Sequence, residues 1–548
     1  MIRRSQSTSD TVFYELPMTK KKLPWRSATH SYNFFMGDCI VDWIMNHMGE
    51  HKHCSKFLDE LSKRGDAFEK LVINDLSMKL GHPVVSVSTR ITPETVLETK
   101  RLIHQGEPII HSAPLSDPST RTRGIADLLI RSDCLHNFFD ISIDQIDSYH
   151  RNNLTPYYYI VVDIKFRTFK LKVDKKTPRN TPSLRAFKDQ LLTYTKLVGS
   201  IQGYQVPFAF LLGRQYEYID KKVSVYERRY DTRLVRINFT EKDHEQSQKA
   251  LQWTDLVRTT KPVITADMIN LNNRTEYDHI KRSIARQIGD ATLVWQCGVR
   301  HRELLKLHGI DSIYDARCTA DILGFNGSRA RAVQAILDVN RGEQLIYYPD
   351  NQNLFPKFPN EYFIDFEIIP ESLLDPLDNS VCSRRSHLFL VGIGQFVNGN
   401  WNYVAHSSAG IDIHHEKDLI NRVIAFLPDD ATLYHWGHIE KTLWTRLLNV
   451  YNIQFTNYNW VDMYSVFIHT PVAIKGCFDY GLKSIALQMA SHGMIQSIWT
   501  TSMNGTECAT HALDSYTNNK CIDETILYNE TDCRVLCEII SYFRNFTS

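Results

Sequence analysis

Two apolar segments in different halves of the chain carry charged residues at alternate positions. Residues 159–165 read Tyr-Ile-Val-Val-Asp-Ile-Lys, and residues 362–369 read Tyr-Phe-Ile-Asp-Phe-Glu-Ile-Ile. Alternate side chains of a β-strand leave the same face, so Asp365 is expected beside Glu367, as Asp163 is beside Lys165. Charges on otherwise apolar strands need compensation, so each segment predicts a sheet with a charged cleft. We therefore expect an α/β multidomain chain with two separate sites.

Length and composition agree with several packed domains. At about 150 residues per domain, a chain of 548 residues predicts roughly three domains. Apolar residues make up 43% of the chain and aromatic residues 11%, as in ordinary globular proteins. The net charge of +1 provides no global field for a polyanion. A nucleic acid would have to be met by local patches and metal ions.

The sequence lacks the usual signals of secretion and membrane insertion. Its 11 cysteines are irregularly spaced without a CxxC pair, and no signal-peptide core is found near the N-terminus. No run approaches the roughly 18 apolar residues of a membrane span. We expect a soluble, intracellular protein of the cytoplasm or nucleus, without a membrane partner. A cellular organism and a virus are equally compatible sources of a protein with this pattern.

Periodicity and turn signals divide the chain into four parts. The expected parts are a flexible basic arm at 1–30, an α/β domain at 31–260, a helical segment at 275–345 and a second α/β domain at 360–548.

The expected elements follow from apolar spacing and β-branched runs. The helices are expected at 57–80, 183–198 and 528–543, and the strands at 124–130, 157–166, 207–213 and from Tyr362 onward.

Three carboxylates and a lysine form the first candidate centre. Asp127 ends a Gly-Ile-Ala-Asp step, and Glu69 lies on the first long helix. In phosphodiester hydrolysis, such acids hold Mg²⁺ or Mn²⁺, while a lysine positions or activates the attacking water. The alternative is an ordinary edge-strand ion pair between Asp163 and Lys165.

The order of these motifs resembles the RecB-like branch of the PD-(D/E)XK nucleases. The matching segments are residues 65–69 (Gly-Asp-Ala-Phe-Glu), 124–127 (Gly-Ile-Ala-Asp), 163–165 (Asp-Ile-Lys) and 190–194 (Gln-Leu-Leu-Thr-Tyr). The resemblance implies a restriction-endonuclease-like fold for the first domain.

The same resemblance assigns roles to individual residues. It implies metal binding by Glu69, Asp127 and Asp163, with Lys165 as the catalytic residue. It further implies that two residues, four apart on one helix face, contact DNA or support the site: Gln190 and Tyr194.

Relatives in this branch often hold an iron–sulfur cluster with four cysteines around the nuclease core. Here Cys39, Cys54 and Cys134 precede Gln190, and the next cysteine is Cys297. We therefore expect no iron–sulfur cluster.

A glycine-containing turn opens a helix in the middle segment. The stretch 323–327 reads Leu-Gly-Phe-Asn-Gly and is followed by Arg329. It looks like a helix-hairpin-helix turn, in which backbone amides at Gly324 and Gly327 cradle a phosphate. Asn326 stands where a second glycine is usual, and asparagine tolerates positive φ better than most residues. The alternative is a plain helix-capping turn.

The second candidate centre combines acids from both ends of the last domain. Asp365 and Glu367 repel each other on one strand face, and this repulsion is relieved if they share a divalent cation. Tyr528 and Asp532 lie four residues apart on one helical face. Asp532 can supply a third ligand, and the hydroxyl of Tyr528 can orient the attacking water.

This part resembles the RNase H-like exonucleases of the DEDD group, and most closely the YprB-type domain. The matching segments are residues 365–367 (Asp-Phe-Glu), 434–441 (Tyr-His-Trp-Gly-His-Ile-Glu-Lys), 461–464 (Val-Asp-Met-Tyr), 480–485 (Tyr-Gly-Leu-Lys-Ser-Ile) and 528–532 (Tyr-Asn-Glu-Thr-Asp). YprB-type domains occur fused to RecB-like nucleases in bacterial proteins. Together, the two resemblances cover most of this chain.

The second resemblance has one departure. Its second motif normally offers an aspartate as metal ligand, and this chain offers Glu440, whose longer side chain tightens the geometry. Lys483 is expected either to contact phosphate or to be a solvated helix residue. His435 and His438 lack a second pair that would complete a zinc site, so we expect them to cap or pack.

The expected function is therefore Mg²⁺- or Mn²⁺-dependent hydrolysis of DNA or RNA, in exonuclease mode, in nucleic-acid processing or repair. The alternative is a nucleic-acid-binding scaffold in which one or both centres are inactive. The sequence has no Gly-X4-Gly-Lys-Ser/Thr loop, so a helicase or repair factor would have to be a separate partner.

Overall fold

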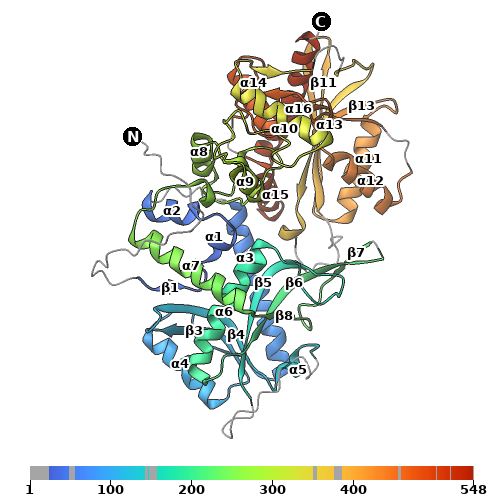
Figure 1. The fold of residues 1–548 in the computed structure, drawn as a ribbon. Helices are drawn as coiled ribbons and strands as arrows, with labels where there is room; N and C mark the ends of the chain where they lie inside the picture. The colour runs from blue at the N-terminus through green and yellow to red at the C-terminus, as the bar shows by residue number, and fades with distance from the viewer. Residues whose placement is uncertain are drawn as a thin grey trace.

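The computed structural model describes residues 24–48, 56–141, 146, 157–221, 223–349, 354–374, 386–454, 458–500, 503–518 and 520–546. The chain is α/β with mixed sheets, and two sheet-containing parts lie on either side of a group of helices (Figure 1). Within the described ranges, no helix is both long and apolar enough to cross a membrane.

The N-terminal part is built on an eight-stranded sheet. The strand order is β2-β3-β4-β5-β6-β7, with β1 paired to β4 and β8 paired to β6. The strands are β1 (Arg26–Ser27), β2 (Val85–Ser86), β3 (Ile109–Asp117), β4 (Thr122–Arg131), β5 (Tyr159–Lys170), β6 (Phe208–Asp220), β7 (Val223–Glu227) and β8 (Val235–Asn238). The three predicted strands of this part are β4, β5 and β6.

Helices cover both faces of this sheet. The helices of the N-terminal part are α1 (Tyr32–Phe35), α2 (Ile40–His47), α3 (Lys56–Leu80), α4 (Pro93–Gln105), α5 (Leu135–Phe138), α6 (Pro182–Gln202) and α7 (Glu241–Thr259), of which α2 packs in the core of the middle segment and not on the sheet. Phe68 of α3 packs with Ile164 on one face, and Leu191 of α6 packs with Val161 on the other. The predicted helices at 57–80 and 183–198 are thereby confirmed as α3 and α6.

The predicted basic arm is corrected in part. Residues 1–23 lie outside the described residues, but Arg26 and Ser27 form β1, parallel to β4. Arg26 also forms an ion pair with Asp255 of α7. The end of the predicted arm is therefore docked on the first sheet by ladder hydrogen bonds and a charge pair.

The middle segment is helical, as predicted. Its elements are the 3₁₀ turn η2 (Ala266–Met268), α8 (Asp278–Ile288), the 3₁₀ turn η3 (Ala291–Leu293), α9 (Val299–Leu307) and α10 (Gly327–Arg341). One apolar core runs from Ile44 of α2 through Leu337 of α10 to Ile540 of α16, so this segment shares its core with the C-terminal part.

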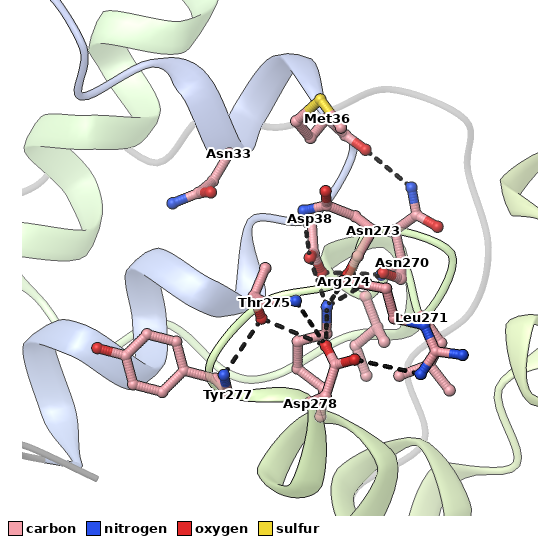
Figure 2. A network of polar contacts seen from close by, with 12 residues as sticks. Asn33, Met36, Asp38, Asn270, Leu271, Asn273, Arg274, Thr275, Tyr277 and Asp278 are labelled. Atoms are coloured by element: carbon pink, nitrogen blue, oxygen red, sulfur yellow. Dashed lines mark hydrogen bonds and ion pairs between the residues drawn. The ribbon is translucent and has the colours of Figure 1, made fainter. Parts of the chain in front are cut away.

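A buried polar network joins the N-terminal part to the middle segment (Figure 2). Lys281 of α8 and Asp38, which precedes α2, are both fully buried, and the Lys281 ammonium lies 2.7 Å from an Asp38 oxygen. Asp38 also accepts hydrogen bonds from the Asn270 backbone at 3.0 Å and the Asn273 side chain at 2.9 Å. These hydrogen bonds offset the cost of removing both charges from water.

The C-terminal part contains a five-stranded sheet in the order β12-β11-β10-β13-β14. Its first three strands pair antiparallel, and β10, β13 and β14 run parallel. The strands are β10 (Glu361–Ile369), β11 (His387–Val397), β12 (Asn400–Ser407), β13 (Thr432–His435) and β14 (Asn459–Asp462), while β9 (Ile346–Tyr347) pairs with β15 (Ala473–Ile474). The acid-bearing strand β10 is therefore central.

Helices pack on both faces of this second sheet. They are the 3₁₀ turn η4 (Glu371–Leu373), α11 (Ile413–Phe426), α12 (Ile439–Tyr451), α13 (Met463–His469), α14 (Leu482–Ser491), α15 (Gly505–Asn518) and α16 (Asp523–Phe546). The predicted closing helix at 528–543 is confirmed as part of α16.

The helix α3 contacts both sheet-containing parts. Phe57 and Leu61 at its start pack against the cluster formed by Leu373 and Cys508 of the C-terminal part. Glu69 lies two turns further along the same helix. The helix that carries Glu69 of the first candidate centre therefore also packs against the C-terminal part.

Candidate metal centres

The first centre is built on β5. Asp163 is fully buried, and its Oδ2 lies 2.7 Å from the Nζ of Lys165. The predicted same-face pairing of these two residues is confirmed. The β5–β6 register shifts directly after Lys165. Asp163 Oδ1 accepts no hydrogen bond from the described residues, so a buried carboxylate oxygen is left open to a cation.

Asp127 of β4 adjoins this pair. Its Oδ2 accepts a hydrogen bond from the Ile164 backbone at 2.7 Å. Burial raises the pKa of Asp127 well above its ordinary value, and the Asp163 charge adds to the rise. Burial lowers the pKa of Lys165, but Asp163 and Asp127 raise it overall, so the lysine is held as an ammonium ion.

Glu69 reaches the same centre from α3 and meets a residue that sequence reasoning missed. Its Oε1 lies 2.7 Å from Nε2 of His111 on β3, and Nδ1 of His111 lies 2.8 Å from the Ser86 hydroxyl. The Glu69 charge also contributes to raising the pKa of Asp127 and of Lys165. The signal in the sequence was a histidine inside the apolar run that forms β3.

The predicted pair on α6 faces the first centre. The Gln190 amide donates to the Tyr194 hydroxyl at 3.1 Å. Tyr194 is 4% exposed, and burial together with the Asp163 charge raises its pKa. Tyr194 packs so closely on Gly124 that a Cβ there would lie 2.5 Å from its ring. Tyr194 therefore lies next to Asp163 and packs against Gly124 of the acid-bearing strand β4.

The second centre is the more compact of the two. Ligand oxygens of Asp365, Glu367 and Asp532 lie within 4.8 Å of one another, and in the described part of the chain no other set of three or more potential ligands does so. Asp365 and Glu367 lie on one face of β10, whereas Ile364 and Phe366 pack into the opposite core. The predicted arrangement of β10, with the two acids on one face and the apolar side chains on the other, is thereby confirmed.

The protonation of these acids reflects their crowding. Burial raises the pKa of Asp365 and Glu367 well above their ordinary values, and the Asp532 charge adds to both. Burial raises the pKa of Asp532 to about 8, although the Lys483 ammonium opposes the rise. Such carboxylates ionise together only when a positive charge joins them.

Two side chains border this acidic cluster. Burial and the Asp532 charge raise the pKa of the Tyr528 hydroxyl, so it remains a proton donor. Lys483 of α14 donates to the Met503 carbonyl at 3.0 Å, and its ammonium lies 5.6 Å from the Tyr528 ring centre. Lys483 is therefore half-buried beside the cluster, and its expected contact with phosphate stays a prediction.

The fourth expected ligand, Glu440, lies near the compact group but outside it. Glu440 at the start of α12 is buried, and its Oε2 lies 3.3 Å from Nδ1 of His435. Its charge raises the pKa of Asp365, Glu367 and Asp532, so it lies close to all three. His435 packs on a tryptophan ring, as the expected packing role requires. His438 occupies the N-cap position of α12 without a side-chain capping bond.

Asn529 and Tyr403 are further residues of the second centre that sequence reasoning missed. The Asn529 amide donates to Asp365 Oδ2 at 2.6 Å, and its oxygen accepts from the Tyr403 hydroxyl at 2.8 Å. Asn529 follows Tyr528 within the motif 528–532, so the sequence could have singled it out. Its contact with Asp365, on a strand far away in sequence, could not be predicted from that motif.

The middle turn has the left-handed backbone expected of its glycines. The φ angle is +79° at Gly324 and +60° at Gly327, while Asn326 has a φ of −139°. The expectation that Asn326 needs tolerance of positive φ is therefore wrong, since it precedes α10 in extended backbone. Arg329 is exposed on the first turn of α10.

Neither a protein-family model nor a curated protein sequence matches this chain. The functional interpretation therefore depends on the motifs and on the geometry of the two centres.

Proposed function

We propose that this protein is a metal-dependent nuclease that hydrolyses phosphodiester bonds of DNA or RNA. The observation that carries the proposal is the compact cluster of half-buried Asp365 with buried Glu367 and Asp532, whose ligand oxygens lie within 4.8 Å of one another. The proposal includes a RecB-like, restriction-endonuclease-like N-terminal domain. It also includes a YprB-type, RNase H-like C-terminal domain, which the acids on a central strand of a mixed sheet support.

The donor set of the second centre fits Mg²⁺ or Mn²⁺. Carboxylate oxygens are the ligands that these hard cations prefer, and burial together with the charges of neighbouring acids raises the pKa values of Asp365 and Glu367. A divalent cation at either centre would offset charge on the phosphodiester and make water a better nucleophile. The Tyr528 hydroxyl is placed to orient that water, and Lys483 to attract the phosphate.

The first centre offers a different arrangement. Lys165 remains protonated beside Asp163, so it can position an attacking water or neutralise a phosphate oxygen rather than accept a proton. Asp163, Asp127 and Glu69 are the proposed metal ligands, and the Asp163 oxygen without a hydrogen-bond partner among the described residues is the best placed. Gln190 would contact the nucleic acid at the edge of this centre.

The middle turn would hold the nucleic-acid backbone between the two centres. The amides of Gly324 and Phe325 already donate to the carbonyls of Asp321 and Ala320. The helix α10, however, begins at the exposed Gly327, and Arg329 adds a positive charge there. Phosphate binding at a helix N-terminus needs this combination. ATP-driven unwinding, where the pathway requires it, would come from a separate helicase or repair factor.

The competing function is a nucleic-acid-binding scaffold with one or both centres inactive. Two observations favour it. Glu440 contacts His435 at 3.3 Å and does not join the compact ligand group. Asp127 directs one oxygen at the Ile164 backbone amide. Both contacts leave fewer oxygens for a cation.

The deciding experiment is cleavage of end-labelled single- and double-stranded DNA and RNA with Mg²⁺ or Mn²⁺. Wild type is compared with Lys165→Ala, Asp365→Ala and the double variant, and Lys172→Ala serves as an exposed-lysine control. A parallel reaction contains EDTA in place of the metal. Binding of each substrate is measured separately with a gel-shift assay in EDTA.

Each pattern of activity has one interpretation. Loss with Lys165→Ala alone assigns cleavage to the N-terminal centre, and loss with Asp365→Ala alone assigns it to the C-terminal centre. Activity that survives in both single variants but not in the double shows two working centres. Binding without metal-dependent cleavage by wild type would reject the nuclease in favour of the scaffold.

A further inference from the structure

Asn529 is a fully buried side chain that makes polar contacts to two other elements of the second centre. From α16, its amide nitrogen donates to Asp365 Oδ2 at 2.6 Å and to the Asp365 backbone carbonyl at 3.3 Å. Its oxygen accepts from the hydroxyl of Tyr403 on β12 at 2.8 Å. Burial raises the pKa of Glu367 and a side-chain hydrogen bond with Asn529 lowers it, so the Asn529 amide contacts both acids of β10.

These contacts fix which end of the amide faces the acid. A tyrosine hydroxyl has one proton, and the Tyr403 oxygen lies 2.8 Å from Asn529 Oδ1 and 3.5 Å from the Ile526 carbonyl. Both neighbours are acceptors, and the nearer one receives the stronger bond. With its oxygen held by Tyr403, Asn529 directs its nitrogen at Asp365, whose backbone carbonyl can only accept a hydrogen bond whatever the protonation of the side chain.

The backbone beside Asn529 leaves space for this arrangement. Gly392 of β11 pairs directly with Asp365 in the β10–β11 ladder. A Cβ at Gly392 would lie 1.6 Å from Asn529 Oδ1 and 2.7 Å from the Tyr403 hydroxyl. Glycine is required here for space, because any side chain would displace the amide from the acid.

We propose that Asn529 is a positioning residue that holds Asp365 by Oδ2, so that Asp365 Oδ1 is the oxygen presented to a divalent cation shared with Glu367 and Asp532. Tyr403 acts through Asn529 by preventing the amide from turning its oxygen toward the acid. This inference rests on the proposed function, since it requires that the second centre binds a metal. Metal ligands that are oriented by outer hydrogen bonds lose affinity when those bonds are removed.

The test measures Mn²⁺ binding to the full chain by isothermal titration calorimetry. The part of the isotherm lost in Asp365→Asn defines the second centre. Asn529→Leu keeps the side-chain shape without hydrogen bonds, and we expect it to weaken that binding by about 10- to 100-fold. Tyr403→Phe removes one hydrogen bond, and we expect a smaller loss of about 2- to 10-fold.

A double variant separates positioning from folding. Tyr403→Phe combined with Asn529→Leu removes both neutral partners of their hydrogen bond, so it should unfold at a temperature nearer to that of wild type than Asn529→Leu alone. Its Mn²⁺ affinity should remain as low as that of Asn529→Leu. Tyr516→Phe, which removes a buried hydroxyl bonded to the Ser408 carbonyl at 2.8 Å, is the matched control and should bind Mn²⁺ like wild type.

Three results would overturn the inference. If Asn529→Leu and Tyr403→Phe bind Mn²⁺ as wild type does while Asp365→Asn does not, the metal site exists but needs no positioning by the amide. If wild type and Asp365→Asn give the same isotherm, there is no metal for Asp365 to hold, and the proposed second centre fails as well. A double variant that regains both stability and affinity would show a purely structural role.

Discussion

Asp532→Asn is expected to stabilise the metal-free protein. The folded state raises the pKa of Asp532 from 3.8 to about 8, mainly through burial. A raised folded pKa means that stability is fully present below the unfolded value and is lost as the pH rises through the folded value. In EDTA, the wild type should therefore become less stable between about pH 4 and pH 8, where the asparagine variant has no such titration.

The size of the effect follows from the same shift. At 1.36 kcal/mol per pKa unit, the rise from 3.8 to about 8 corresponds to an upper bound of about 6 kcal/mol. A buried amide retains part of the burial cost, so we expect the variant to gain about 2–4 kcal/mol at pH 8. The gain should disappear near pH 4, where the unfolded acid is itself protonated.

Denaturant unfolding in EDTA at several pH values measures this gain. Asp418→Asn is the matched control, because its carboxylate is 65% exposed and pairs with Arg422 on the same helix. Its replacement should change the free energy of unfolding by less than about 0.5 kcal/mol. Mn²⁺ at about 1,000 times its Kd should reverse the order, since such a ligand stabilises wild type by about 4.1 kcal/mol. Destabilisation by Asp532→Asn in EDTA at pH 8 would refute the reasoning, because it would mean that the charged acid is already compensated by Lys483.

Three other outcomes are expected. Mn²⁺ binding to wild type should strengthen as the pH rises toward 8 and should release protons from Asp532, as titration calorimetry in buffers of different ionisation heat can detect; pH-independent binding would contradict the raised pKa. Lys281→Met leaves Asp38 buried without its cation (Figure 2) and should cost about 3–5 kcal/mol in denaturant unfolding, with recovery in the double variant that adds Asp38→Asn. Gly392→Ala should cost about 1–3 kcal/mol by overpacking, whereas Gly65→Ala, with no atom within 4 Å of its added Cβ, should stabilise α3 by about 0.5–1 kcal/mol; equal effects of the two would reject the packing argument.

Local periodicity was enough to predict the strands and helices that carry the acids. Two-residue alternation placed Asp163 beside Lys165 and Asp365 beside Glu367, because successive strand side chains alternate between faces regardless of the rest of the fold. Helical spacing likewise oriented Tyr528 with Asp532. The sequence by itself therefore determined which side chains share a face.

Tertiary packing decided which faces meet. The approach of Asp532 to β10, the contact of His111 with Glu69 and the hold of Asn529 on Asp365 all join elements distant in sequence. Glu440 is a further example. Its motif predicted a position near the acids, but only the folded structure shows that one of its oxygens faces His435. Sequence patterns report an element's own periodicity, whereas these contacts depend on how separate elements pack together, and that depends on shape and burial across the whole domain.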